Sequence, residues 1–247
     1  MPFDLTSLDQ PFQALAAYDW GADATPFMTL DAAVIAAHGD KALRAELEKR
    51  FTALLGGGAS RAAKEYACRK LMMIGTAASV PALAALLGDA DNSHMARFAL
   101  ERIPGPEAGA ALNSALGTVS DPLKIGMISS LASRRDPACV TVLTTLLRGS
   151  PRLAIPAANA LGTIQSAESI QALTAADPFA AAGVGEAVVN ARLACAESLL
   201  ASGKRPDALA IYQGLAKAAA GKPDAKAIEL AATRGILACA DAVASAS

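Results

Sequence analysis

Apolar residues recur along most of this chain at intervals of three and four positions. The segment around Val80, Leu83, Leu86 and Leu87 shows the spacing clearly. In an α-helix this spacing gathers the apolar side chains on one face, whereas a strand would alternate them every second residue. Glycine, proline and short polar residues separate the periodic segments. The pattern therefore predicts an all-α protein.

The periodic segments repeat. Four stretches align without gaps, and equivalent positions fall at 74, 103, 134 and 164, so the period is 29, 31 and 30 residues. Each repeat consists of two predicted helices with one apolar stripe each, and neither helix can bury its stripe alone. Neighbouring repeats must therefore stack around a continuous core, which is the arrangement of a helical solenoid.

The predicted helices of the four repeats follow from the apolar spacing and from the residues that precede them. Ser60, Asn92, Asp121 and Ser150 stand where a side-chain oxygen can cap the first helix of each repeat. The first helices are expected at 61–74, 93–102, 122–133 and 151–164, and the second helices at 79–87, 107–116, 138–147 and 168–175.

The segments before and after the repeats differ from them. Residues 1–29 contain half of the ten aromatic residues, including Phe3 and Trp20, and we expect a capping arm in which Trp20 anchors the packing. Residues 30–58 form an irregular first helical pair, with helices at 31–38 and 41–55, and residues 59–176 hold the four repeats. Residues 177–247 form a hairpin, with helices at 186–201 and 206–219, and a final helix from 225 to 244. We expect all four parts to form one continuous solenoid domain.

Composition supports close helix packing and limits the partners. Hydrophobic residues make up 53% of the chain but aromatic residues only 4%, so the core is built mainly from Ala, Leu, Ile and Val. The net charge is −1 and no basic run exceeds two residues, which argues against nucleic-acid binding. The four cysteines share no metal-binding spacing, so buried free thiols are expected.

No stretch is apolar and long enough for a membrane span, and the first residues lack the basic and apolar regions of a signal peptide. We therefore expect a soluble chain, cytoplasmic by default or periplasmic if an export signal has been removed.

The stretch IGTAASVPALAALLGDADNSHMARFALERIPGP resembles bacterial HEAT repeats of the phycobilisome-lyase type. In that pattern Ile-Gly closes the first helix, and an acidic turn follows the second. Pro104, the pair Arg134-Arg135, and Gln165 replace the glycine or the Ile-Gly pair in the later repeats. The resemblance implies a HEAT-like, armadillo-like solenoid, that is, a right-handed α-α superhelix. The hairpin within residues 177–247 resembles a tetratricopeptide unit, in which a tyrosine fills the gap between closely packed helices.

Sequence motifs for catalysis or metal binding are missing from the chain. The two histidines, His38 and His94, are not followed by Glu, and no nucleophile elbow or phosphate-binding loop occurs. We therefore expect no catalytic residues, no metal and no cofactor.

The expected function is a non-catalytic scaffold for protein–protein interaction. Two alternatives remain open. One is an accessory domain of an enzyme, lyase-like or carbohydrate-related, because YDWGAD and the hairpin resemble modules of large bacterial proteins. The other, less favoured, is a nucleic-acid-binding HEAT-like protein.

One segment suggests where a protein partner binds. Residues 153–167 contain no charged side chain. Either this helix is central and covered by its neighbours, or its outward face, with Asn159 and Gln165, is an apolar patch that contacts a partner. In the second case, arginines on both sides of the segment form a polar rim. These arginines are Arg134, Arg135, Arg148 and Arg152. The identity of the partner and the oligomeric state are left open.

Overall fold

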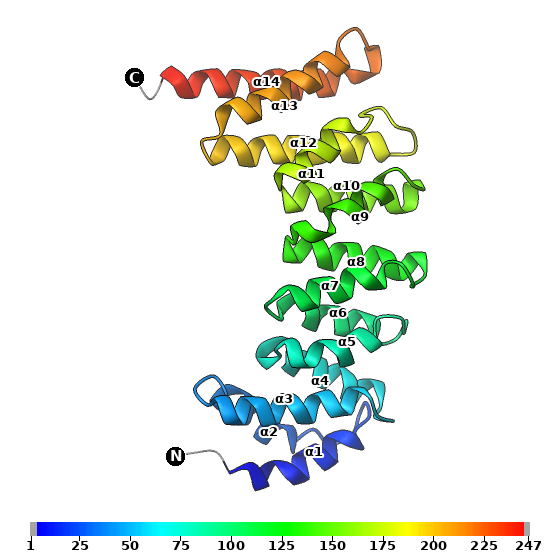
Figure 1. Ribbon diagram of the computed structural model, residues 1–247, viewed down its shortest axis with the longest axis vertical. Coiled ribbons are helices and arrows are strands. Elements are labelled where there is room, and N and C mark those ends of the chain that lie inside the picture. The colour runs from blue at the N-terminus through cyan, green and yellow to red at the C-terminus, as the bar shows by residue number, and fades with distance from the viewer. Residues whose placement is uncertain (1–3, 245–247) are drawn as a thin grey trace. The chain divides into compact units, whose positions relative to one another are not determined.

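The computed structural model describes residues 4–244, with side chains as far as residue 240 (Figure 1). Every regular element in this part of the chain is a helix. Helices that follow one another in sequence also pack against one another, so the fold is all-α and solenoid-like, as the sequence predicted. The contacts divide the chain into two compact units, Met1–Arg134 and Arg135–Ser247. The boundary falls between the two helices of the predicted third repeat.

Unit 1 contains eight of the α-helices in the described part of the chain. Helices α3, α4, α6 and α8 pack against one another in sequence order, while α5 packs against α7. The elements of unit 1 are η1 (Leu5–Leu8), α1 (Asp9–Ala16), α2 (Phe27–Ala36), α3 (Lys41–Leu55), α4 (Arg61–Ile74), η2 (Ala77–Ser79), α5 (Val80–Ala85), α6 (Ser93–Arg102), α7 (Pro106–Ala115) and α8 (Asp121–Arg134).

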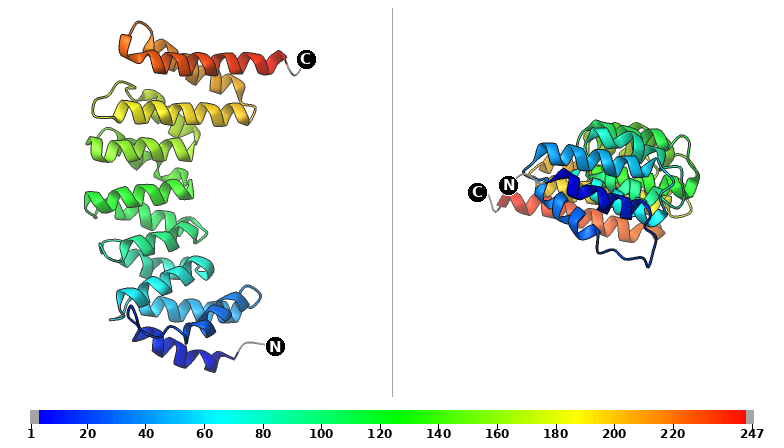
Figure 2. Two further views of the ribbon diagram at one scale, coloured as in Figure 1. Left: turned by 180° about the vertical axis from the view of Figure 1, so that it is seen from behind. Right: turned by 90° about the horizontal axis from the view of Figure 1, so that it is seen from below.

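Unit 2 has the same two-layer organisation. Helices α10, α12 and α14 form one layer, because α12 contacts both of the others, and α9 contacts α11 in the second layer. Helix α13 packs against α12 and α14 and crosses in front of α14 in Figure 1, whereas Figure 2 shows α12 and α14 from behind. The elements of unit 2 are η3 (Pro137–Cys139), α9 (Val140–Leu147), α10 (Pro151–Ile164), α11 (Ala167–Ala175), α12 (Val184–Ala201), α13 (Arg205–Ala219), η4 (Pro223–Ala225) and α14 (Lys226–Ala244).

The predicted helices agree closely with the observed ones. Helices α4, α6 and α10 begin and end at the predicted residues. Two of the second helices, α5 and α9, begin later than predicted because a 3-10 turn precedes each of them. The turns are initiated by Thr76 and Asp136, whose side chains accept hydrogen bonds from the amides two residues ahead.

The predicted helix caps are only partly correct. Ser60 caps α4, since its hydroxyl accepts a hydrogen bond of 3.0 Å from the Ala63 amide. The Asn92 side chain instead donates to Asp89 at 2.6 Å and does not cap α6. Asp121 lies inside the first turn of α8, where it binds Lys124, and Ser150 occupies the N-cap position of α10 without a side-chain hydrogen bond.

Aromatic side chains fill the N-terminal part of unit 1. The Phe12 ring lies 4.9 Å from the Phe51 ring, and the Phe27 ring lies 4.8 Å from the Tyr66 ring. Trp20 is 68% exposed, so the prediction that it anchors the packing is wrong. It occupies a turn between α1 and α2, and the phenylalanines fill the core in its place. Phe3, which the sequence placed in the same arm, lies outside the described residues.

Small residues allow close helix packing in unit 2. A Cβ atom on Gly162 of α10 would lie 2.7 Å from the Ala191 Cβ atom on α12. Tyr212 of α13 packs against Gly235 of α14, where a Cβ atom on the glycine would clash with the tyrosine ring.

All four cysteines are buried and free, as expected. Among the described residues, no helix has both the length and the apolar character needed to cross a membrane.

Candidate functional site

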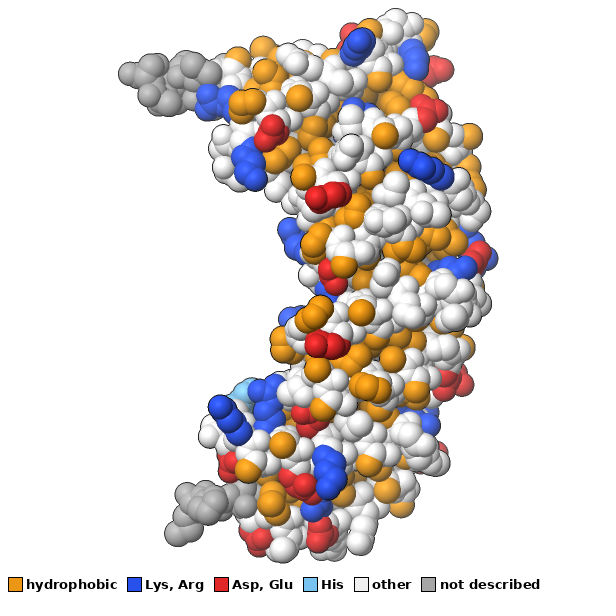
Figure 3. All heavy atoms as spheres, viewed as in Figure 1, with side chains coloured by type: hydrophobic (Ala, Val, Ile, Leu, Met, Phe, Trp, Pro, Cys, Tyr) orange, Lys and Arg blue, Asp and Glu red, His pale blue; other side chains and the backbone are white. Residues whose placement is uncertain are grey.

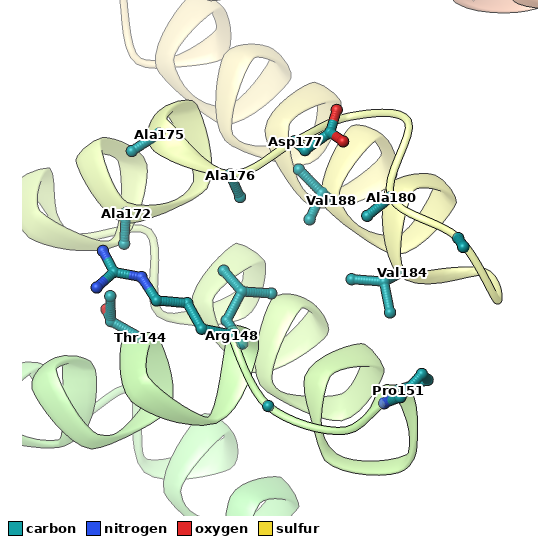
Figure 4. Close-up of a pocket in the computed structure, with 13 residues that line it drawn as sticks. Thr144, Arg148, Pro151, Ala172, Ala175, Ala176, Asp177, Ala180, Val184 and Val188 are labelled. Carbon is teal, nitrogen blue, oxygen red and sulfur yellow. The ribbon is translucent and has the colours of Figure 1, made fainter.

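Helix α11 of unit 2 lies between two surface grooves. The first, called here the α9–α11 groove, has a volume of about 440 Å³. The end of α9 and the connection to α10 form one wall, the end of α11 forms the other, and α12 forms the floor (Figure 4). Its lining is dominated by small side chains, and the residues used below are Thr144, Arg148, Ala172, Ala175, Asp177 and Val188.

The second, called here the α11–α13 groove, lies on the other side of α11 and also has a volume of about 440 Å³. Helix α11 contributes the wall opposite α13, and the end of α12 reaches the groove through Leu199. The residues used below are Gln165, Ile170, Thr174, Leu199, Lys204, Asp207 and Ala210. Helix α11 is therefore a ridge with a groove along each side, and both grooves belong to the layer of second helices.

Charged side chains lie at the edges of both grooves. Figure 4 shows the Arg148 side chain lying along the mouth of the α9–α11 groove beside Thr144 and Ala172. The Asp177 carboxylate points away from Arg148 and accepts a 2.9 Å hydrogen bond from the Phe179 amide. Lys204 and Asp207 line the α11–α13 groove and are exposed. Figure 3 shows mostly hydrophobic and uncharged side chains on this face of unit 2, with scattered charges.

Two of the predicted partner-binding residues line these grooves. Arg148 lines the α9–α11 groove and Gln165 lines the α11–α13 groove. Gln165 ends α10 in the left-handed conformation, with φ of 57°, and its side-chain amide donates to the Ala194 carbonyl at 3.4 Å. Each groove is therefore lined by one of the residues predicted to bind a partner, and the sequence did not predict the grooves themselves.

Arg152 and Asn159 lie on a different surface. Both are exposed on α10, and their spacing of seven residues places them on one face of that helix. The apolar residues of α10, such as Leu153 and Leu161, are buried. Helix α10 packs against α9 and α12. It is therefore a central helix covered by its neighbours, which was the first of the two interpretations of the uncharged residues 153–167. Asn159 lies on its polar outer face.

Arg134 has a structural role within unit 1. Its guanidinium donates to the Ile103 carbonyl at 2.7 Å and to the Gly105 carbonyl at 2.6 Å, and it also binds the Leu100 carbonyl. These bonds satisfy carbonyls at the C-terminal end of α6, which have no partners within the helix. Arg134 is therefore not a free cation at the rim of a binding surface. The neighbouring Arg135 is exposed and adopts φ of 51°.

Sequence reasoning missed the grooves because alanine has two roles in this chain. Ala172 and Ala175 follow the helical period and count as apolar, yet Ala175 is exposed at a groove edge. A helix whose exposed face consists of alanine leaves space between itself and its neighbours, because its side chains are short. The alanines at 175, 176 and 180–182, on both sides of Asp177-Pro178-Phe179, were the available signal.

A further groove, of about 650 Å³, lies beside α3 in unit 1, but its central charged groups bind backbone. Glu48 is buried there and accepts a 2.6 Å hydrogen bond from the Thr76 amide, while Arg44 donates to the Ile74 carbonyl at 2.7 Å.

His94 packs edge-on against the Phe98 ring at 4.7 Å and contacts Arg97. No group of three or more His, Cys, Asp or Glu residues that could hold a metal ion occurs among the described residues.

Burial suppresses the reactivity of the thiols. It raises the pKa of Cys68 to about 12, with a smaller contribution from the charge of Glu65. Burial also raises the pKa of Cys139 and of Cys195 to about 11, with Asp136 contributing at Cys139. A reactive cysteine needs a lowered pKa and access to solvent, so these three thiols have the properties of core residues.

Comparison with known proteins does not extend this description. No protein-family model matches the chain, and no curated protein matches it. The HEAT-like and tetratricopeptide-like resemblances therefore stay predictions from the sequence.

Proposed function

We propose that this chain is a non-catalytic, HEAT-like helical-repeat scaffold that binds an extended segment of a protein partner. The segment lies across the second-helix layer of unit 2 and contacts α9, α11 and α13. In this proposal the chain acts through binding alone, either as a separate protein or as one module of a larger bacterial protein.

The pair of grooves along α11 carries this proposal. Each groove has a volume of about 440 Å³, which is within the range of roughly 300–1,000 Å³ typical of binding clefts. Small residues such as Ala172 and Ala210 line the walls, so the backbone of a bound segment can approach the helices closely. Helical solenoids commonly bind partners along the extended surface of one helix layer.

The charges at the groove edges support a peptide partner. Arg148 and Lys204 are exposed side chains with long apolar stems that can cover a bound backbone while their charged groups stay in water. Asp207 supplies a charge of the opposite sign in the α11–α13 groove. Uncharged small residues between charged edges match the usual organisation of an interface with an apolar centre and a polar rim.

Selection of binding peptides from a random library displayed on phage, followed by groove-blocking variants, tests the proposal. Ala175→Arg adds a long side chain at the α9–α11 groove, and Ala210→Arg does the same at the α11–α13 groove; both alanines are exposed. Thr163→Arg adds the same charge at an exposed position of α10 and is the matched control. We expect each blocking variant to weaken binding of the selected peptides at least tenfold and the control to change it less than twofold. Failure to select any peptide, or equal affinities for all variants, would contradict the proposal.

A further inference from the structure

Arg192 is a buried arginine without a partner. It lies in the middle of α12 and is only 5% exposed. Its Nε atom is enclosed and makes no hydrogen bond, and none of the ion pairs among the described residues includes Arg192. Arginine is almost never buried in proteins unless its charge is paired, because removal of an isolated charge from water is costly.

Other arginines that are partly buried in this chain are compensated. Arg44 donates to the Ile74 carbonyl, Arg97 donates to the Gly126 carbonyl at 2.9 Å, and Arg134 donates to four carbonyls. The Nε atoms of Arg97 and Arg134 are also enclosed and unpaired, but their Nη atoms make these hydrogen bonds. Arg192 has no equivalent arrangement in the described part of unit 2. Burial lowers the pKa of Arg192, and no neighbouring acid counteracts that shift. Its guanidinium therefore has unused capacity to bind an anion.

The position of Arg192 follows from two helix faces. On α12, Val188 lines the α9–α11 groove and Leu199 lines the α11–α13 groove. Arg192 lies between them in the sequence, four residues after Val188 and seven before Leu199. These spacings place all three residues on one face of the helix. On α13, Gly214 continues the face of Asp207 and Ala210, which line the α11–α13 groove.

The guanidinium lies against Gly214, because a Cβ atom on this glycine would be 3.1 Å from Arg192 Nη2. Ala210, one turn before Gly214 on α13, and Leu199, two turns after Arg192 on α12, line the α11–α13 groove. The guanidinium therefore lies beyond the lined part of this groove, along the same two helix faces, and neither Arg192 nor Gly214 is itself a lining residue.

We propose that Arg192 binds a carboxylate side chain of the partner segment in the α11–α13 groove, and that the segment is therefore acidic at this position. A guanidinium presents two parallel N–H groups that match the two oxygens of a carboxylate. Lys204 and Asp207 line the same groove with opposite charges, so the preference for an acidic residue comes from Arg192. This inference rests on the proposed function and specifies the chemistry of the partner.

The test uses the full chain and peptides of twelve residues selected from a random phage-displayed library. Selected peptides are expected to be enriched in Asp or Glu. Each acidic position is then replaced by its amide, Glu→Gln or Asp→Asn, and affinities are measured for the wild type and for Arg192→Met. At one acidic position of the peptide, we expect replacement by the amide to lower the affinity for the wild-type protein at least tenfold. The same replacement should lower the affinity for Arg192→Met less than twofold. Arg152→Met, an exposed arginine on α10, is the control and should retain the full tenfold effect.

Two further measurements separate binding from folding. Circular dichroism and the melting temperature establish that Arg192→Met is folded, and methionine keeps most of the side-chain volume. Gly214→Ala keeps the charge but places a methyl group beside Nη2, so it should also weaken binding of the acidic peptides several-fold. If peptides bind the grooves without an acidic preference, or if the amide effect persists in Arg192→Met, the inference is overturned while the proposed function stands. If no peptide is selected, both are overturned.

Discussion

Arg44 and Glu48, one turn apart on α3, bind the two sides of the same connection between α4 and η2. Arg44 Nε donates to the Ile74 carbonyl at 2.7 Å, and Glu48 accepts a 2.6 Å hydrogen bond from the Thr76 amide. The cation meets the carbonyl end of one helix and the carboxylate meets the amide end of the next, which matches the dipole of each helix. Glu48 also accepts hydrogen bonds from the hydroxyls of Thr76 and Ser79.

Glu48→Ala should destabilise unit 1 by about 2–3 kcal/mol, because it leaves the Thr76 amide and the buried Ser79 hydroxyl without an acceptor. Urea unfolding followed by circular dichroism measures the change. Glu229→Ala, at an exposed position of α14, is the control and should change the free energy of unfolding by less than about 0.5 kcal/mol. Equal effects for the two variants would show that the hydrogen bonds of Glu48 do not stabilise the connection.

Adjacent arginines at the end of α8 should respond in opposite directions. Arg134→Met removes the bonds to the carbonyls of α6 and should destabilise the protein by about 1–2 kcal/mol. Arg135 has φ of 51°, which glycine adopts without strain, so Arg135→Gly should stabilise the protein by up to about 1 kcal/mol. Thermal unfolding of both variants gives the comparison. A stabilising Arg134→Met would refute the capping role of this side chain.

The contact between Gly162 and Ala191 sets the separation of α10 and α12. Gly162→Ala should destabilise unit 2 by about 1–3 kcal/mol, although alanine favours helix, because the added methyl group lies 2.7 Å from the Ala191 Cβ atom. Adding Ala191→Gly removes the opposing methyl group and should restore part of the loss. Gly88→Ala, where a Cβ atom meets nothing within 4 Å, is the control. The packing argument fails if the double variant is less stable than the sum of the two single changes predicts.

The buried thiols should make the protein less stable in alkaline solution. Burial raises the pKa of Cys68 to about 12 and of Cys139 and Cys195 to about 11, above the ordinary thiol value of 9.0 that applies after unfolding. A raised pKa means that the unfolded chain loses the proton first, so the stabilisation is complete below pH 9 and decreases between pH 9 and about 11.

From pH 8.0 to pH 9.5 we expect a loss of about 2 kcal/mol for the three thiols together, measured by urea unfolding. The variant with Cys68→Ala, Cys139→Ala and Cys195→Ala should lose less over the same interval. An equally steep decrease in that variant would assign the pH dependence to other groups.

Helix positions could be predicted from the sequence because the apolar stripe and the breaks between helices are local signals. The boundaries of α4, α6 and α10 required only the residues within and beside each helix. Long-range contacts could not be predicted in the same way. Arg134 was predicted to be a surface charge at the rim of a binding site. Its acceptors, the carbonyls at the end of α6, lie about thirty residues earlier in the chain, so the residues beside Arg134 do not indicate them. Carbonyls are present at every residue, so no sequence pattern marks them as ligands.

The grooves depend on similar long-range relationships. Arg148 and Gln165 were predicted to bind a partner from their position beside an uncharged helix, and they line the two grooves. Arg192 was not predicted to bind a partner, because a single arginine in an apolar helix is compatible with either a paired or an exposed side chain. Its burial without a partner depends on the packing of α12 and α13, which the sequence pattern does not specify.

Hydrogen–deuterium exchange of the full chain, with and without a selected peptide, tests the central claim most directly. If the segment lies across the second-helix layer of unit 2, bound peptide should slow exchange in α11 and in the half of α13 that faces it, residues 205–214. Exchange in α3 and α4 of unit 1 should be unchanged. Protection confined to unit 1, or absent from both α11 and α13 while the peptide is bound, would contradict the account.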